Sequence, residues 1–311
     1  MGEHWHARAG SKQLRLSNLD KVYWPDEGFT KGDLLTYYFN ITPVMLPHLI
    51  DRPLTLKRMP NGVTGDFFYE KNAPAHTPEW MPRIPVRSEN KVINFLGVRD
   101  VADVLYVANL GCIEFHPLHT KALDQERPTY AFFDLDPFEP ATFDDVKHVA
   151  TLVKVALDQL GLRCYPKTSG ATGMQIMVPL DGTLTYDWVR GFVGAVSDLV
   201  HAADPDTTTL EWEIPKRTGK VFLDVNMNRQ GANIAGAYSV RPEPGATVSA
   251  PFTWEEIDDI EPSDFTMATM MARVEAAGDP FLEVAEGPGQ SIDAALKKLD
   301  ATPRKAREFR R

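Results

Sequence analysis

The chain has 311 residues, of which 43 are acidic and 33 basic, and its formal net charge is -10. A chain of this length buries one large core or two fused lobes. Its composition, 43% hydrophobic and 10% aromatic, excludes the disordered and fibrous classes. The negative charge argues against a protein that binds nucleic acid through bulk charge, so any phosphate contact must come from local basic clusters.

Cysteine usage and the N-terminus indicate the compartment. Cys112 and Cys164 are too few for a disulfide framework and lack metal-site spacing, so we expect two core thiols in a reducing compartment. The first ten residues contain no apolar leader segment, and no apolar run is long enough to span a bilayer. These features predict a cytoplasmic protein without a membrane partner.

The first third of the chain begins with a predicted helix over residues 34–49, preceded by a cap region at 30–33. A strand is predicted over 54–59, and residues 67–71 follow a glycine-containing turn. Four prolines then predict a loop that no helix or central strand could cross: Pro74, Pro78, Pro82 and Pro85.

From Val92 onward, short apolar runs alternate with helical stretches. Strands are predicted over 130–135, 175–180 and 220–225, and helices near 143–159 and 186–202. This pattern predicts an α/β (α+β) fold, with a central mixed sheet, flanking helices and an N-terminal subregion.

The expected division is an N-terminal lobe over 1–125, a catalytic core over 126–290, and a C-terminal helix with a basic tail over 291–311, unless all three form one domain. For the basic end of the tail, from Pro303 to Arg307, we expect disorder.

Two carboxylates stand two residues apart at the end of an apolar strand. Asp134 and Asp136 follow residues 131–133, and side chains at positions i and i+2 of a strand share one face. Like charges at the end of a buried strand are costly unless a cation joins them, and oxygen ligands suit Mg or Mn. Asp224 ends a second apolar run. Three such carboxylates predict a site for two divalent ions, whereas the pair alone is also typical of a turn or a single calcium ligand.

A glycine-containing loop, residues 167–173, precedes the strand at Gln175. Lys167, Ser169, Gly170 and Thr172 supply donors and free backbone N–H groups that suit phosphate oxygens. The lysine precedes the glycines and the loop leads into a strand, so the P-loop pattern is not matched. In isolation the loop is more typical of an ordinary hairpin turn.

The order of these features, Asp134-Leu135-Asp136, the Ser169 loop and then Asp224, resembles that of archaeo-eukaryotic primases. Residues 16–25, 67–74 and 237–241 also resemble the polymerase domain of the bacterial end-joining enzyme ligase D, and the resemblance extends from about residue 14 to residue 299. It implies a primase-polymerase fold and a nucleotidyltransferase that extends or gap-fills broken DNA ends in non-homologous end joining. The resemblance further implies two-metal catalysis and a preference for ribonucleotides.

The resemblance also implies roles for individual residues. Asp134, Asp136 and Asp224 would hold two Mn or Mg ions. The incoming NTP or dNTP would be bound by His116, Lys167, Ser169, Gly170, Thr172, Gln175 and Arg241. A 5′-phosphate across a DNA gap would be bound by Asn18, Lys21 and Lys31. DNA or template contacts would come from Phe67, Phe68 and Arg217, with one of the two phenylalanines facing inward and the other stacking on a base.

Two positions depart from the family pattern. Gln175 stands where the family usually has a histidine, and Thr172 where many members carry a lysine, so triphosphate binding should be weaker or differently pH dependent. The chain has no K-x-D-G ligase signature, so we expect a separate DNA ligase and Ku as partners, at the nucleoid. Two alternatives stay open: a primase that starts chains without a primer, and a DNA-end binding module with weakened catalysis.

Overall fold

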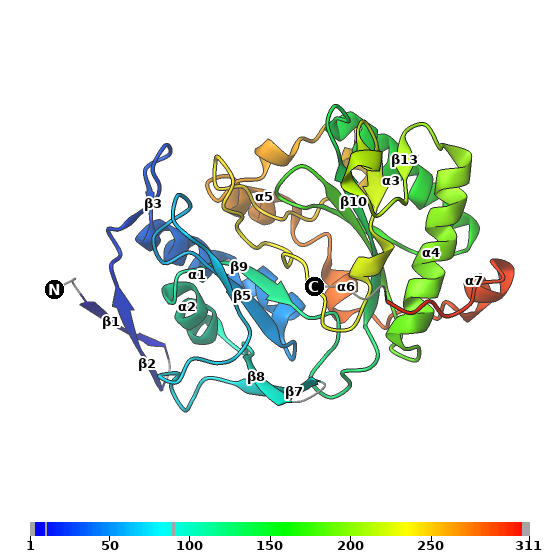
Figure 1. Cartoon of the computed structure of the whole chain (residues 1–311). Coiled ribbons are helices and arrows are strands. Elements are labelled where there is room, and N and C mark those ends of the chain that lie inside the picture. The colour runs from blue at the N-terminus through cyan, green and yellow to red at the C-terminus, as the bar shows by residue number, and fades with distance from the viewer. Residues whose placement is uncertain (1–3, 10, 89–90, 307–311) are drawn as a thin grey trace. The chain divides into compact units, whose positions relative to one another are not determined.

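The computed structural model describes residues 4–9, 11–88 and 91–306 (Figure 1). It divides into two compact units, each built from several segments. The first unit contains Met1–Leu123, Asn233–Ala250 and Ser263–Asp279, and the second contains Asp124–Ala232, Pro251–Pro262 and Pro280–Arg311. The expected lobes at 1–125 and 126–290 therefore differ from the compact units, because the chain returns twice to the first unit after residue 232. Among the described residues, no helix has the length and apolar character needed to cross a bilayer.

The first unit is built on an antiparallel sheet in which β5 is the central strand. Its strands run in the order β6-β5-β8-β7, and β9 also pairs with β5. These strands are β5 (Leu54–Arg58), β6 (Phe68–Glu70), β7 (Arg83–Ser88), β8 (Lys91–Leu96) and β9 (Cys112–Pro117). Two small hairpins precede them, formed by β1 (His4–Ala9) with β2 (Lys12–Ser17) and by β3 (Val22–Trp24) with β4 (Phe29–Thr30).

The first unit also holds three helices: α1 (Lys31–Leu49), α2 (Val101–Asn109) and α5 (Met270–Ala277). Helix α1 begins three residues before the predicted start, because Thr30 and Asp33 form a capping box in which each side chain bonds the other residue's backbone N–H. Residue Pro85 lies in β7, which pairs with β8 alone, and such an edge position tolerates a residue without an N–H.

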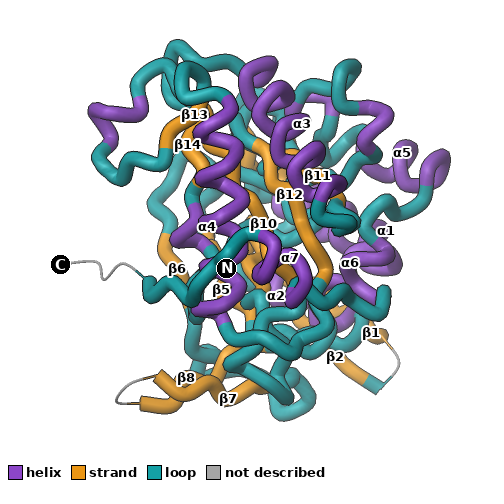
Figure 2. The backbone as a smooth tube through the Cα atoms, turned by 90° about the vertical axis from the view of Figure 1, so that its right-hand side faces the viewer, coloured by secondary structure: helices purple, strands orange, loops and turns teal. Residues whose placement is uncertain are grey.

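The second unit is a five-stranded mixed sheet with strand order β11-β12-β10-β14-β13, in which only β13 and β14 run parallel. Its strands are β10 (Tyr130–Pro137), β11 (Tyr165–Thr168), β12 (Met174–Pro179), β13 (Thr208–Thr209) and β14 (Val221–Leu223). Helices α3 (Phe143–Gln159) and α4 (Tyr186–Ala203) pack against each other and against β10 (Figure 2). The predicted α/β fold with a mixed sheet is confirmed.

Strand ends differ from the predictions by a few residues, and one difference bears on the site. The run predicted over 220–225 forms a strand only from Val221 to Leu223, and Asp224 begins a short 3-10 helix (Val225–Met227) as its N-cap. Its carboxylate accepts a hydrogen bond of 2.9 Å from the N–H of Asn226. The aspartate therefore leaves the strand by capping the next turn.

The C-terminal part of the second unit contains α6 (Leu282–Glu286) and α7 (Asp293–Lys298). The expected disorder of the basic end is wrong for residues 303–306, because this segment packs against α4: the N–H of Arg304 donates to the carbonyl oxygen of Asp187 at 2.9 Å. Arg307 lies outside the described residues.

Candidate active site

Two of the three predicted carboxylates lie on β10 of the second unit, and the third, Asp224, directly follows the adjoining strand β14. Asp134 and Asp136 are two residues apart on β10, and Asp136 is the register partner of Phe222 on β14. The N–H of Asp224 donates to the carbonyl oxygen of Asp134 at 3.0 Å, so Asp224 lies directly across from Asp134. The sheet thus brings together carboxylates that are 88 to 90 positions apart in the chain.

Burial and mutual repulsion perturb these carboxylates. Burial raises the pKa of Asp134 well above its ordinary value, and the charges of Asp136 and Asp224 add to this, while a hydrogen bond from Gln175 opposes it. Burial likewise raises the pKa of Asp224, partly offset by the N–H of Asn226 and the charges of Arg229 and Arg217. Each carboxylate is costly to ionise in this environment.

The donor set suits a divalent cation, although its side chains are not gathered around one point. Within the described residues, no three His, Cys, Asp or Glu side chains are arranged as they would be around a metal ion. Asp224 nevertheless lies directly across from Asp134, and Asp136 shares the sheet face of Asp134, so a hard cation would relieve the repulsion among these carboxylates. Oxygen donors of this kind suit Mg or Mn over softer metals.

A buried lysine is linked to Asp134 through Gln175. These three residues are register partners on β11, β12 and β10, so their side chains lie on one face of the sheet. Gln175 donates from Nε2 to Asp134 Oδ1 at 2.9 Å, and its Oε1 accepts from Nζ of Lys167, which is fully buried. A glutamine serves here because its amide accepts on one side and donates on the other. The lysine thereby supplies a positive charge that lowers the pKa of Asp134.

The phosphate-loop candidates form the tight turn between β11 and β12. The hydroxyl of Ser169 accepts hydrogen bonds from the N–H groups of Ala171 and Gly173, both at 3.1 Å. Gly170 has a positive φ of 74°, and a Cβ at Gly173 would lie 2.3 Å from the carbonyl oxygen of Leu135, so a side chain is excluded there. Thr172 is exposed at the turn. Ser169 therefore shapes the turn, in addition to any ligand contact.

Arg217 is buried against aromatic rings. Its guanidinium carbon lies 3.6 Å from the centroid of the Phe222 ring, and its nitrogens donate to the carbonyl oxygens of Glu211 and Trp212 at 2.9 and 2.6 Å. Arg229, which sequence reasoning missed, acts on Asp224 by its charge.

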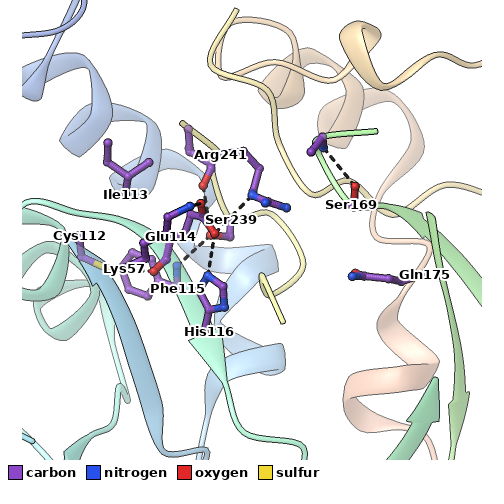
Figure 3. Close-up of polar contacts among 12 residues, drawn as sticks. Lys57, Cys112, Ile113, Glu114, Phe115, His116, Ser169, Gln175, Ser239 and Arg241 are labelled. Atoms are coloured by element: carbon purple, nitrogen blue, oxygen red, sulfur yellow. Dashed lines mark hydrogen bonds and ion pairs between the residues drawn. The ribbon is translucent and has the colours of Figure 1, made fainter. Parts of the chain in front are cut away.

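The side chains of Lys57, His116 and Arg241 converge on Glu114 in the first unit (Figure 3). Glu114 is 1% exposed. Its oxygens lie 2.6 Å from Lys57 Nζ, 2.6 Å from His116 Nε2 and 3.3 Å from Arg241 Nε. Burial by itself would raise the pKa of Glu114, but the hydrogen bond from His116 and the charges of Arg241, His116 and Lys57 outweigh it and lower the pKa to about 2. Glu114 thus holds the two predicted nucleotide ligands, His116 and Arg241, in fixed positions.

The second ring nitrogen of His116 is available to a ligand. With Nε2 on Glu114, Nδ1 is buried and has no hydrogen-bond partner among the described residues. Tyr69 packs edge-on against the imidazole, with ring centroids 5.8 Å apart. A buried ring nitrogen without a partner is costly, so this atom is positioned to bond an incoming group.

Both predicted stacking residues face outward. Phe67 is 53% exposed and Phe68 is 44% exposed, which corrects the expectation that one of the two would be buried. Phe67 precedes β6, so the alternation of a strand does not apply to it. Each ring lies under a cation: Lys57 Nζ is 5.0 Å from the Phe67 centroid, and the Arg58 guanidinium is 5.1 Å from that of Phe68.

The three predicted 5′-phosphate ligands line a single pocket of the first unit, with a volume of about 530 Å³. Lys31 is 4% exposed and donates to the Ser17 carbonyl oxygen and to Asn109 Oδ1, both at 2.8 Å. Lys21 donates to the carbonyl oxygen of Pro60 at 2.7 Å. Asn18 has a positive φ of 56°, which asparagine tolerates better than most residues.

The pocket is electropositive. Burial, together with the charges of Lys21 and Arg58, lowers the pKa of Lys31 to about 8. Arg58 and His76 also line the pocket, and sequence reasoning missed both. Arg58 lies on the predicted strand at 54–59, but no spacing signal could link it to residues forty positions earlier.

The mixed sheet and its carboxylates at adjoining strand positions agree with the primase-polymerase fold that the resemblance implies. The model of the family described as "LigD, primase-polymerase domain" matches residues 30–281, and the chain belongs to this family.

Relatives and a solved structure support this assignment. The chain is 31% identical over 281 residues to a multifunctional non-homologous end joining protein LigD of Mycolicibacterium smegmatis, and 30% identical over 298 residues to a bifunctional one of Bacillus subtilis. The alignments cover 90% and 94% of this chain but 37% and 48% of those proteins, so the chain spans less than half the length of these relatives. The polymerase domain of Mycobacterium tuberculosis ligase D, solved in complex with DNA, matches with a TM-score of 0.82 at 30% identity and covers 88% of this chain and 98% of that one.

Proposed function

We propose that this chain is a nucleotidyltransferase that extends or gap-fills broken DNA ends in non-homologous end joining. The observation that carries the proposal is the set of mutually repelling carboxylates at adjoining strand positions, with Asp134 buried and Asp136 and Asp224 half-buried. The family assignment supports it, as do relatives named for end joining and a polymerase domain solved with DNA.

The chemistry divides between the ions and the chain. Mg or Mn ions held by Asp134, Asp136 and Asp224 would activate the primer 3′-hydroxyl and stabilise the leaving pyrophosphate. The chain's own residues position these carboxylates. Gln175 fixes the rotamer of Asp134, and Lys167 beyond it keeps a buried positive charge close to the carboxylates.

The first unit offers two proposed triphosphate ligands. His116 offers its unpaired Nδ1, and Arg241 supplies a guanidinium held by Glu114. In the second unit, Gly170 and the exposed Thr172 in the turn offer neutral donors. Because Gln175 and Thr172 are neutral, we propose that Lys167 supplies the positive charge of that unit toward the phosphates.

We further propose that the pocket around Lys31 binds the 5′-phosphate of a gap. A terminal phosphate dianion is richer in charge than a phosphodiester, and the lysines Lys21 and Lys31 match it as compact cations. Phe67 and Phe68, both exposed, would stack on bases near the template. Ku and a DNA ligase activity are the proposed partners, and ribonucleotides the preferred substrates.

Binding to a 5′-phosphate should depend on pH through Lys31. The Lys31 pKa of about 8 means that its charge is lost as pH rises through that value, so affinity for gapped DNA with a 5′-phosphate should fall between about pH 7 and 9. The same DNA with a 5′-hydroxyl should show a smaller change. Lys31→Met should remove the difference, and an unchanged pH profile in that variant would refute the assignment of Lys31.

The test of the function is primer extension on gapped DNA with and without a 5′-phosphate. Mg or Mn is supplied together with either ribonucleotides or deoxyribonucleotides. Metal-dependent addition that the 5′-phosphate stimulates is the expected result. Addition on unprimed single strands would instead favour a primase, and phosphate-dependent binding without any addition would favour a DNA-end binding module. Comparing the two nucleotide types under the same conditions tests the ribonucleotide preference.

A further inference from the structure

The segment that follows α7 is docked along α4 within the second unit. In Figure 1 it is the red chain that leaves α7 and crosses α4. The N–H of Arg304 donates to the Asp187 carbonyl oxygen at 2.9 Å, and the buried guanidinium of Arg190 donates to the carbonyl oxygen of Arg304. The guanidinium of Arg304 in turn pairs with Asp198. Residues 301–306 are called the strap below.

Two glycines in α4 make room for the strap. A Cβ at Gly191 would lie 2.1 Å from the carbonyl oxygen of Thr302, and one at Gly194 would lie 2.3 Å from Nη1 of Arg304. Glycine inside a helix is unfavourable relative to alanine, so both positions carry a cost that the close approach of the strap explains. The helix is therefore shaped to receive this segment.

The docked strap places Lys305 in the wall of a pocket that contains Asp224. This pocket has a volume of about 270 Å³ and is also lined by Trp212 and Phe222, whose ring centroids are 6.5 Å apart. Lys305 is exposed, and within the described residues its ammonium forms no ion pair or hydrogen bond. Arg190, also at the pocket, is 3% exposed, and its Nε has no partner among the described residues.

We propose that Lys305 binds a backbone phosphate of the nucleic-acid strand whose 3′ end reaches Asp224, and that the strap is the device that holds it there. This inference rests on the proposed function. A chain of net charge -10 needs local cations to hold a polyanion beside its carboxylates. Lys305 is such an unpaired cation, and it lines the pocket that contains Asp224.

Lys305 is placed to bind DNA and does not block the carboxylate site. A basic tail that blocked the site would form an ion pair with Asp224, but within the described residues Lys305 pairs with no carboxylate. Arg304, by contrast, is engaged with Asp198 and serves to anchor the strap. The two neighbouring cations thus have separate tasks.

The first test compares Lys305→Ala with Lys297→Ala, which removes an exposed lysine from α7 that does not line the pocket. Loss of one exposed phosphate contact should weaken equilibrium binding of primed DNA about three- to five-fold in Lys305→Ala alone. The slope of log affinity against log salt should fall by about 0.7 to 0.9. Nucleotide KM should not change, and Lys305→Arg should restore binding.

The second test moves the strap without touching the lysine. Gly191→Ala should displace the strap, so trypsin should cleave faster after Arg304 and Lys305, and primed DNA should bind as weakly as in Lys305→Ala. The double variant should be no weaker than either single variant. Ala202→Gly, in the same helix away from the strap, serves as the control.

The inference would be overturned by unchanged DNA binding in Lys305→Ala or by an equal loss of binding in Lys297→Ala. Faster nucleotide addition in Lys305→Ala would also overturn it, because that result would mean that the strap obstructs the pocket. Additive losses in the double variant would overturn the role of the strap. Binding is measured without nucleotide addition, so failure of the polymerase proposal would be recognised separately, by the absence of addition in the unaltered chain.

Discussion

Asp134→Asn should abolish metal-dependent nucleotide addition while preserving the fold. The variant keeps an oxygen that can accept the Gln175 hydrogen bond but loses the charge that a divalent ion requires. A metal stabilises the transition state by several kcal/mol, so we expect addition to fall by at least about a thousand-fold. Equilibrium binding of gapped DNA should change little.

The same substitution should raise thermal stability. Asp134 is buried and is repelled by Asp136 and Asp224, and a neutral amide of the same shape removes that repulsion. Asp158→Asn, which removes an exposed carboxylate paired with Lys154, is the matched control and should leave addition unchanged. Retained addition in Asp134→Asn, or in Asp224→Ala, would contradict the metal assignment.

Glu114→Gln should cost about 3 kcal/mol of unfolding free energy at pH 7, the equivalent of the difference between an ordinary glutamate pKa of 4.5 and the pKa of about 2 in the fold. Glu114 is 1% exposed, so solvent screening does not reduce this value much. The substitution leaves Lys57, His116 and Arg241 without their shared carboxylate. Urea unfolding of the two proteins measures the difference.

The pH dependence of this effect follows from the direction of the shift. Because the folded-state pKa lies below the unfolded-state value, the stabilisation is fully present above about pH 4.5 and is lost as pH falls toward 2. The difference in stability between Glu114→Gln and the unaltered chain should shrink over that window. Glu79→Gln, at an exposed position of the same unit, should show no such trend. A pH-independent difference would mean that packing, not charge, is lost.

Glu114→Gln should also raise the nucleotide KM more than it lowers kcat. His116 and Arg241, the two proposed triphosphate ligands, both depend on the Glu114 carboxylate for their positions. A uniform loss of ground-state binding raises KM with little effect on kcat.

The sequence by itself determined the elements whose signals are local. The helix predicted near 143–159 is observed from Phe143 to Gln159, because a capping box at Thr142 and an apolar stripe act within a few turns. The acidic pair on one face of β10 also followed from the two-residue period of a strand. The family could be recognised because its motifs are short and contiguous.

Only the tertiary structure decided which distant groups meet. The register of β11, β12 and β10 aligns Lys167, Gln175 and Asp134, and no local pattern specifies that alignment. Lys57 and Arg241 meet on Glu114 because β5 and β9 pair and residue 241 returns to the first unit, at sequence separations of 57 and 127. The register of a strand depends on which of its faces is buried in the core. The return of a later segment to the first unit likewise depends on the packing of many residues together, so no single residue predicts it.

The strap and the exposed phenylalanines are two places where an expectation from composition was wrong. The composition of residues 303–307 predicted disorder, yet residues 303–306 are held by carbonyl and carboxylate groups of α4 and by two glycines that leave space for them. Phe67 and Phe68 are apolar and were expected to divide between core and surface, yet both lie outside under cationic side chains. Composition predicts only the average tendency of a residue type to be buried or ordered. The contacts that the fold supplies decide whether a particular residue is buried or ordered.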